Sequence, residues 1–282
     1  MPDRRPHVPT WFVGECLGTF LLVFFGCGSV CASVLTGAQS GIFQVAVVWG
    51  LGIGTAICVT GSLSGAHLNP AVSLSMATAR RLPWSNVPGY VLAQFIGAFA
   101  ASGTLHAVFS GAFIQFESEH HLLRGAPGSE SSAMALTEFY PSPAWHALAG
   151  GAGVVSQSTA CAVEALGTAV LALVILSATD RRNASRPGLL APSVIGLTVT
   201  LLISLFGPLT MAGFNPARDL APRLYCAFAG WGSWVFRANG YGWLVVYVLA
   251  PIAGGQAAAL FFTKVLGPRY AADESSGTAL RL

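Results

Sequence analysis

Two copies of the tripeptide Asn-Pro-Ala carry the most specific chemistry in this sequence. They occupy Asn69, Pro70 and Ala71 and, again, Asn215, Pro216 and Ala217. Asparagine is a strong helix N-cap, and proline suits the first helical position because its missing N–H would be unpaired there in any case. Each copy therefore predicts the start of a helix. A helix start carries roughly half a positive charge. Two such ends facing one another would repel cations, and the asparagine amides would remain as donors for a passing hydroxyl or water.

Charged residues follow the second copy directly. Arg218 lies three residues after Asn215, in the first turn of the predicted helix. A charge inside a membrane costs at least about 2.5–3.5 kcal/mol, so Arg218 should face a polar cavity. The alternative is a structural ion pair with Asp219 or with a carboxylate from a loop. Asp219 and Arg223 are four residues apart and can pair on one helix face. We expect that pair to shape the outer mouth of the cavity.

Glu15 and Glu164 are lone carboxylates within long apolar runs. Acids in such places suggest function by default, and a proton relay is one interpretation. We favour another, in which each carboxylate accepts N–H bonds from an irregular loop whose backbone cannot stay unpaired in apolar surroundings. The carbonyls of these loops would form a row of acceptors, although the His67 side chain could simply be packed. The loop residues are Gly65, Ala66 and His67 and, in the second half, Met211, Ala212 and Gly213.

The composition places these groups in a membrane. Of 282 residues, 54% are hydrophobic and only 9% are charged, whereas an average soluble domain has about 25% charged residues. The net charge of +3 is too slight to suggest a nucleic-acid partner, and the six cysteines include no Cys-x-x-Cys pair. The sequence has no nucleophile–base pair, nucleotide loop or metal-ligand cluster. We therefore expect no enzyme activity, no cofactor and no metal site.

Six apolar segments are long enough to cross a bilayer, which takes about 20 helical residues. They run approximately over Trp11–Leu35, Phe43–Thr60, Val87–Phe109, Ser158–Ala178, Leu189–Phe206 and Trp243–Leu266. Two further apolar stretches, Ser64–Ala79 and Gly207–Phe228, are broken by Asn-Pro and should enter the membrane and return. This pattern predicts an all-α membrane protein with six transmembrane helices and two re-entrant half-helices.

The two halves of the chain repeat one another. Glu-Cys-Leu-Gly-Thr at Glu15 recurs as Glu-Ala-Leu-Gly-Thr at Glu164, and the two Asn-Pro-Ala copies are 146 residues apart. Because each half holds three spans, an odd number, the second half (158–266) must be inverted relative to the first (12–109). Inverted repeats place the functional site near the midplane, where broken helices meet. We therefore predict one channel domain over residues 1–282, with short tails at 1–10 and 267–282.

Charge is distributed unevenly over the connections between the spans. If the six segments alternate, the acids Glu117, Glu119, Glu130 and Glu138 share one side. By the positive-inside rule the opposite, basic side is cytoplasmic, and it holds both termini. We predict a multi-pass protein of the cell (inner) membrane. The basic residues on the cytoplasmic side are Arg4, Arg5, Arg80, Arg81, Arg181, Arg182, Arg186, Lys264, Arg269 and Arg281.

The loops around the two tripeptides resemble a known family. Ser64-Gly-Ala-His-Leu-Asn-Pro-Ala-Val72 and Gly213-Phe-Asn-Pro-Ala-Arg-Asp-Leu-Ala-Pro222 are similar to the signature loops of aquaporins and glycerol facilitators. The aspartate after Arg218 resembles the glycerol-facilitator branch, as do the stretches 116–125 and 207–210. The resemblance covers about residues 12–266. It implies an aquaporin-like bundle in the lipid bilayer, a homotetramer whose subunits each conduct glycerol, water and similar small neutral solutes.

The resemblance also implies a narrowest point formed by four residues, namely Trp49, Ile203, Ala212 and Arg218. In the family the arginine donates to solute hydroxyls, and the tryptophan is an apolar wall for the carbon face of glycerol. Facilitators have glycine and phenylalanine where this chain has Ile203 and Ala212, so bulk has moved from one wall to the other. Trp, Ile, Ala and Arg together resemble nodulin-like plant channels. Tyr247 also replaces a proline common in facilitators.

Three alternatives to a glycerol channel stay open. A water-selective aquaporin would follow if Ile203 and Ala212 leave too little room. A secondary transporter also has inverted repeats and broken helices, but it needs ionisable groups on the route, and only Glu15 and Glu164 qualify. A junction or adhesion role is the third alternative. The connection Trp145–Ser158 is longer than in facilitators and is interpreted as a loose turn without an assigned function.

Overall fold

The computed structural model describes residues 8–148, 150 and 155–270, and the regular elements of this part are all helices. Six of its helical segments are long and apolar enough to cross a membrane, which confirms the six predicted spans. Five are α1 (Thr10–Thr36), α2 (Ile42–Ser64), α4 (Val87–Val108), α8 (Gln157–Ala178) and α9 (Ala191–Thr210). The sixth joins α12 (Gly242–Leu244), η4 (Val245–Leu249), α13 (Ala250–Phe261) and η5 (Phe262–Leu266).

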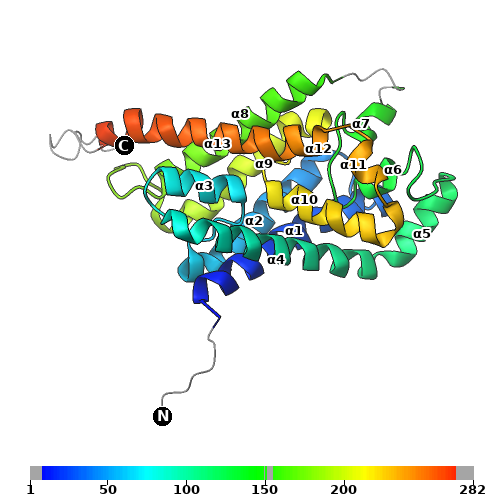
Figure 1. The fold of residues 1–282 in the computed structure, drawn as a ribbon, viewed down its shortest axis with the longest axis horizontal. Helices are drawn as coiled ribbons and strands as arrows, with labels where there is room; N and C mark the ends of the chain where they lie inside the picture. The colour runs from blue at the N-terminus through cyan, green and yellow to red at the C-terminus, as the bar shows by residue number, and fades with distance from the viewer. Residues whose placement is uncertain (1–7, 149, 151–154, 271–282) are drawn as a thin grey trace, which may run out of the picture.

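Two short helices begin at the Asn-Pro-Ala copies, as their capping chemistry predicts. They are α3 (Pro70–Thr78) and α10 (Pro216–Cys226), and they lie one after the other between α13 and α4 in the view of Figure 1. Asn69 Oδ1 accepts the Ala71 N–H at 2.8 Å, and Asn215 Oδ1 accepts the Ala217 N–H at 3.0 Å. Each asparagine has an extended backbone, so it acts as an N-cap.

The second re-entrant segment starts later than predicted. Gly207–Thr210 still belongs to α9, with Pro208 inside the helix, and the irregular stretch is limited to residues 211–215. A proline so close to a helix end removes only one backbone bond. In apolar surroundings the other backbone N–H and C=O groups are best paired by continuing the helix. The first segment is similar, because α2 also continues to Ser64, beyond the predicted Thr60.

Close glycine contacts relate the two repeats. A Cβ at Gly50 would lie 2.5 Å from the carbonyl oxygen of Gly196, and a Cβ at Gly196 would collide with the carbonyl oxygen of Gly50. Each glycine precedes the asparagine of its own half by 19 residues. The crossing of α2 and α9 is therefore self-complementary, with each repeat contributing the same position. Small residues at such crossings let the two backbones approach closely.

A second pair of glycines lies where α4 crosses α1 and where α13 crosses α8. A Cβ at Gly97 in α4 would collide with the carbonyl oxygen of Cys16, and one at Gly254 in α13 would collide with that of Ala165. Cys16 and Ala165 each follow the buried acid of their half by one residue. Both crossings therefore lie beside the carboxylates that hold the re-entrant loops.

We expect Gly97→Ala to lower the thermal stability of the purified protein, because the added methyl group meets backbone rather than a flexible side chain. Overpacking of this kind costs about 1–3 kcal/mol. The matched control is Gly61→Ala in α2, where the nearest atom, Cγ2 of Ile57, lies 4.0 Å from the added carbon. Thermal unfolding of both variants in detergent compares them directly, and equal midpoints would contradict the close crossing.

The long connection between the two halves is more structured than its polar sequence suggests. It contains α5 (Ser110–Glu119), α6 (Glu130–Ala133) and α7 (Pro143–Leu148). Shorter turns elsewhere are η1 (Trp84–Asn86), η2 (Gly188–Leu190), η3 (Ala227–Trp231) and α11 (Trp234–Arg237). The interpretation of Trp145–Ser158 as a loose turn is wrong at its start, because α7 continues to Leu148. Residues 149 and 151–154 of that connection lie outside the described residues, as do most of the two predicted tails, 1–7 and 271–282.

Candidate functional site

Two cavities meet at three side chains in the middle of the bundle. The first, called the long cavity here, is lined by both capping asparagines and reaches Thr179 and Ala191 at the ends of α8 and α9. The second, called the loop cavity, lies against the connection between the halves and includes Ser142 and Trp145. Both cavities are lined by Trp49, Ile203 and Arg218. These three residues therefore form the constriction between the cavities.

The loops before the two asparagines have matching backbone conformations. Left-handed φ angles occur at Gly65 (84°), Ala66 (49°) and Leu68 (56°). The corresponding residues of the second loop, Met211 (64°), Ala212 (60°) and Phe214 (52°), have the same sign. The irregular backbone predicted here is thus present in both halves. Its residues line the long cavity, apart from Met211, which lines the loop cavity.

Glu15 binds the first loop through its carboxylate. The fully buried side chain accepts the N–H groups of His67 at 2.9 Å and Leu68 at 2.8 Å. It also accepts the Ser64 hydroxyl at 2.7 Å and the Gln94 amide at 2.7 Å. Four donors thus surround one carboxylate, which holds the first loop in place.

Glu164 binds the second loop in the same way. Its carboxylate accepts the N–H groups of Gly213 at 3.0 Å and Phe214 at 2.7 Å and the hydroxyl of Thr210 at 2.6 Å. Buried N–H groups left unpaired cost about 1–3 kcal/mol each. The two acids therefore stabilise backbone conformations that an isolated chain would not adopt.

The capping asparagines also join the two halves, a contact that the sequence does not indicate. The Asn69 amide donates to the carbonyl oxygen of Phe214 at 2.8 Å, and the Asn215 amide donates to that of Leu68 at 2.8 Å. One amide hydrogen of each asparagine is therefore already used. The expectation that both amides serve as free donors is corrected to this extent, because an amide nitrogen has two hydrogens and one remains.

Tyr90 and Tyr247 hold the ends of α2 and α9. The Tyr90 hydroxyl donates to the Ser64 carbonyl at 2.8 Å, and the Tyr247 hydroxyl donates to the Thr210 carbonyl at 3.0 Å. Each tyrosine precedes the crossing glycine of its span, Gly97 or Gly254, by seven residues. Tyr247, which departs from the facilitator pattern, is thus the counterpart of Tyr90. It satisfies a carbonyl that a helix end leaves unpaired.

We expect Tyr247→Phe to reduce stability by about 1 kcal/mol, because it removes one buried hydrogen bond and little else. The Thr210 carbonyl would lose its donor, and Met211 would gain freedom. Tyr90→Phe is the matched variant in the other half. Thermal unfolding should show similar losses for both, and a loss confined to Tyr90→Phe would show that the two tyrosines are not equivalent.

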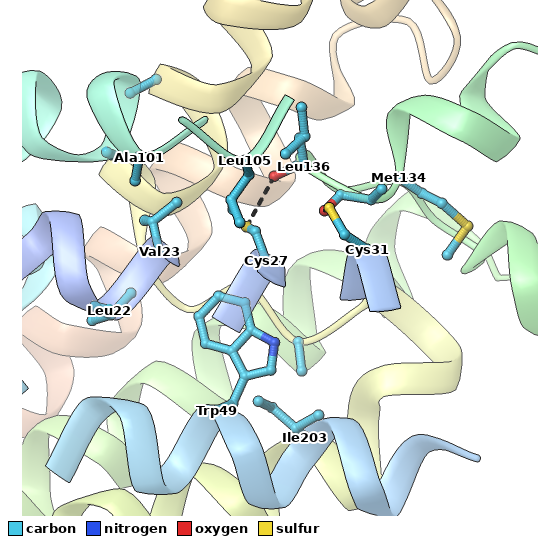
Figure 2. Close-up of a cluster of buried hydrophobic side chains, with 14 of the residues drawn as sticks. Leu22, Val23, Cys27, Cys31, Trp49, Ala101, Leu105, Met134, Leu136 and Ile203 are labelled. Carbon is cyan, nitrogen blue, oxygen red and sulfur yellow. Dashed lines mark hydrogen bonds between the residues drawn. The ribbon is translucent and has the colours of Figure 1, made fainter. Parts of the chain in front are cut away.

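The constriction combines an apolar wall with a cation. The Arg218 guanidinium carbon lies 4.6 Å from the centre of the Trp49 ring, and both side chains are almost fully buried. Ile203 completes the apolar side beside Trp49 (Figure 2). Ala212, predicted as the fourth member, lines only the long cavity. The structure thus brings three of the four predicted residues to the junction, whereas the fourth lines the long cavity alone.

Glu138 is a charged neighbour of the constriction that sequence reasoning did not select. Its side chain is fully buried, and Oε1 lies 2.9 Å from Nε of Arg218. Nη1 of Arg218 donates to the Leu136 carbonyl at 3.0 Å. Burial raises the pKa of the Glu138 carboxyl, and Arg218 opposes that rise. In the sequence, Glu138 is one of several acids in a polar connection, and only the apolar residues beside it indicate that it is buried.

Asp219 and Arg223, which we expect to shape the outer mouth of the cavity, are almost fully buried. They pair with each other at 2.8 Å, and neither lines the two cavities. Asp219 Oδ1 accepts the Thr137 hydroxyl at 2.7 Å and the Glu138 N–H at 2.9 Å, and Arg223 donates to the Glu138 carbonyl. The pair therefore affects the constriction by holding the backbone of the loop that carries Glu138.

Two cysteines of α1 hold the same loop from the other side. The Cys27 thiol donates to the Leu136 carbonyl at 3.3 Å, and the Cys31 thiol donates to that of Ala135 at 3.7 Å. Figure 2 shows the Cys27 contact above Trp49. Both thiols are buried. The loop behind Arg218 is thus bound by α1 as well as by α10.

His67 fits both interpretations that the sequence allows, a residue of the loop that lines the cavity and a packed side chain. Its residue lines the long cavity, while Nδ1 lies 3.2 Å from the Ser73 hydroxyl and the ring packs near Tyr90, with centroids 5.0 Å apart. The side chain is therefore held in place beside the cavity. Its backbone N–H donates to Glu15, so both the backbone and the side chain of His67 are held in place.

Comparison with known proteins agrees with this geometry. Residues 5–262 match the family model described as major intrinsic protein. The chain is 36% identical over 256 residues to the glycerol uptake facilitator protein of Haemophilus influenzae, covering 90% of this chain and 93% of the relative. It is 38% identical over 243 residues to that of Pseudomonas aeruginosa, covering 86% and 83%. The solved aquaglyceroporin of Plasmodium falciparum superposes with a TM-score of 0.78 at 30% identity, covering 93% of this chain and 98% of the other. The chain belongs to the major intrinsic protein family.

Proposed function

We propose that this protein is a passive transmembrane channel for glycerol and related small uncharged solutes, together with water. The observation that carries the proposal is the constriction, which faces a solute with the Trp49 ring and Ile203 on its apolar side and the Arg218 guanidinium on its polar side. Glycerol has carbon on one side and hydroxyls on the other, so it matches both. The glycerol uptake facilitators and the aquaglyceroporin that resemble the chain support this choice of substrate.

The remaining site residues act along the same path in this proposal. The carbonyls of Gly65, Ala66, His67, Met211 and Gly213 accept hydrogen bonds from solute hydroxyls, and Asn69 and Asn215 offer their remaining amide hydrogens. Glu15 and Glu164 act only as supports of the two loops. The starts of α3 and α10 carry partial positive charge toward the centre of the path, which disfavours cations and interrupts proton transfer.

The channel needs no catalytic step and no coupled ion. Solutes move in single file down their own gradient. A secondary transporter would require Glu15 or Glu164 to change protonation. Their carboxylates instead accept several hydrogen bonds each within the folded loops, which favours a structural role.

A water-selective channel is the second candidate, because Ile203 places a branched side chain at the constriction, where facilitators have glycine. We expect Ala212, which lines the long cavity, to compensate, since a methyl group there leaves the room that a larger side chain would occupy. Glycerol permeability therefore depends on the combined size of these two residues.

Stopped-flow light scattering on proteoliposomes distinguishes these candidates. Purified protein is exposed to sucrose, glycerol and urea gradients in parallel, with empty liposomes as the control. We expect fast shrinkage followed by fast re-swelling in glycerol. Fast shrinkage without re-swelling would show a water-selective pore. Baseline rates in both phases, from folded protein, would contradict an open channel and favour a gated protein or one with a junction role.

We further propose that the protein is a homotetramer of single channel domains in the cell (inner) membrane, with both termini cytoplasmic. The arginine-rich connections support this orientation through the positive-inside rule. Native mass spectrometry of the detergent-solubilised protein tests the assembly. Single cysteines at exposed positions in a background without exposed native cysteines, labelled from one side of the membrane only, test the orientation.

A further inference from the structure

Gly26 of α1 lies directly against the ring of Trp49. A Cβ built on Gly26 would collide with ring carbons Cε3, Cζ3 and Cη2 of Trp49. Ordinary contacts between carbon atoms are about 3.5–4.0 Å long, so no side chain larger than hydrogen fits here with the ring in place. The indole therefore occupies space on α1 that exists only because residue 26 is glycine.

The Trp49 ring also lies at the constriction. The Arg218 guanidinium carbon is 4.6 Å from the ring centre, and both side chains line both cavities. One turn away, a Cβ at Gly52 would lie 2.5 Å from Cβ of Phe25. That contact brings the backbones of α1 and α2 close together. A group added at residue 26 would thus displace the end of the Trp49 side chain toward the constriction.

Comparison of the two repeats separates glycines that both halves need from Gly26, which only the first half has. Gly18 and Gly167 each follow the buried acid of their half by three residues, and a Cβ at either would collide with the residue before the capping asparagine, Leu68 or Phe214. These two glycines are therefore needed in both halves for the same structural reason.

Gly26 follows Glu15 by eleven residues, and the same position after Glu164 is Ile175. Likewise Trp49 precedes Asn69 by twenty residues, and the same position before Asn215 is Ile195. One half thus pairs a glycine with a tryptophan where the other half has two isoleucines. In the first half, a small residue on α1 leaves room for a large ring on α2, and that ring reaches the constriction.

We propose that Gly26 is a specificity-determining residue of the channel, which sets the width of the constriction by giving the Trp49 ring its seat. The inference deepens the proposed function and rests on it. Gly26 lines neither of the two cavities, so it is a positioning residue that acts through Trp49. Its effect should depend on solute size, because water needs less of the opening than glycerol does.

The test compares Gly26→Ala with the wild-type protein in proteoliposomes, by stopped-flow measurement of water and glycerol permeability. An extra methyl group in a fitted site changes discrimination by about tenfold or more. We expect glycerol permeability to fall by about that factor while water permeability falls much less. Gly28→Ala is the matched control on the same helix, since its Cβ would meet only Leu105 Cδ2 at 3.3 Å. It should leave the glycerol-to-water ratio unchanged.

A second variant shows whether the effect passes through the ring. Gly26→Ala combined with Trp49→Phe carries a smaller ring, which leaves room for the methyl group, and it should recover most of the lost glycerol flux. An unchanged ratio in Gly26→Ala, or no recovery in the double variant, would overturn the inference. If Gly26→Ala folds poorly, recovery of folding and flux together in the double variant still supports it. Absence of glycerol flux in the wild-type protein would instead contradict the proposed function.

Discussion

Glu138→Gln is expected to destabilise the protein strongly and to impair flux of both water and glycerol. The fully buried Arg218 would lose the carboxylate 2.9 Å from its Nε and keep the Leu136 carbonyl as its polar partner. Breaking a buried ion pair by removing one partner costs about 3–5 kcal/mol, since the other charge remains uncompensated. The guanidinium would then turn toward the polar path and bind solute too tightly for fast exchange.

The experiment combines thermal unfolding in detergent with stopped-flow permeability. Glu119→Gln, an exposed acid on α5, is the matched control and should behave as wild type. The double variant Glu138→Leu with Arg218→Leu removes both charges, which is often neutral for stability. It should recover the unfolding midpoint but lose discrimination between solutes. Wild-type stability and flux in Glu138→Gln would show that the pair contributes little.

Glu164→Ala is expected to abolish flux through loss of the second loop. The variant leaves the N–H groups of Gly213 and Phe214 and the hydroxyl of Thr210 without their acceptor. At about 1–3 kcal/mol for each buried unpaired donor, the total is a large part of the stability of a typical protein. The Phe214 carbonyl also accepts a hydrogen bond from the Asn69 amide, so the damage reaches the first half.

Glu164→Gln separates support from proton coupling. Its amide oxygen still accepts one or two of these bonds, whereas its NH2 group faces a donor, so we expect an intermediate loss of stability with reduced passive flux. Uptake is measured with and without a proton gradient. A folded Glu164→Gln with normal passive flux that has lost only uphill accumulation would favour a secondary transporter over a channel. We expect no uphill accumulation in the wild-type protein.

The sequence alone determines the outline of this protein, because the signals involved are local or repeated. Runs of about 20 apolar residues define spans by length, and Asn-Pro-Ala defines a helix start through the chemistry of two adjacent residues. Duplication of the acid and of the tripeptide then fixes the inverted order of the halves. The end of α9 does not follow from such a signal, because the helix continues through Pro208 to Thr210.

The constriction depends on tertiary structure in a way that spacing does not reveal. Trp49, Ile203 and Arg218 are far apart in the chain, and the family resemblance, rather than any local pattern, indicated that they meet. Glu138 looked like one acid among several in a polar connection. The residues beside Glu138 in the sequence do not indicate that Asp219 and Arg223 bind this loop and hold it inside the bundle.

The contacts between the halves were likewise decided only by folding. Each capping asparagine bonds to the loop of the other repeat, and Gly26 matters only because the Trp49 ring lies on it. A local pattern reports which backbone conformation a residue favours. Which side chain fills the space beside it depends on how two distant helices cross, and that crossing is set by the sum of many close-packed contacts.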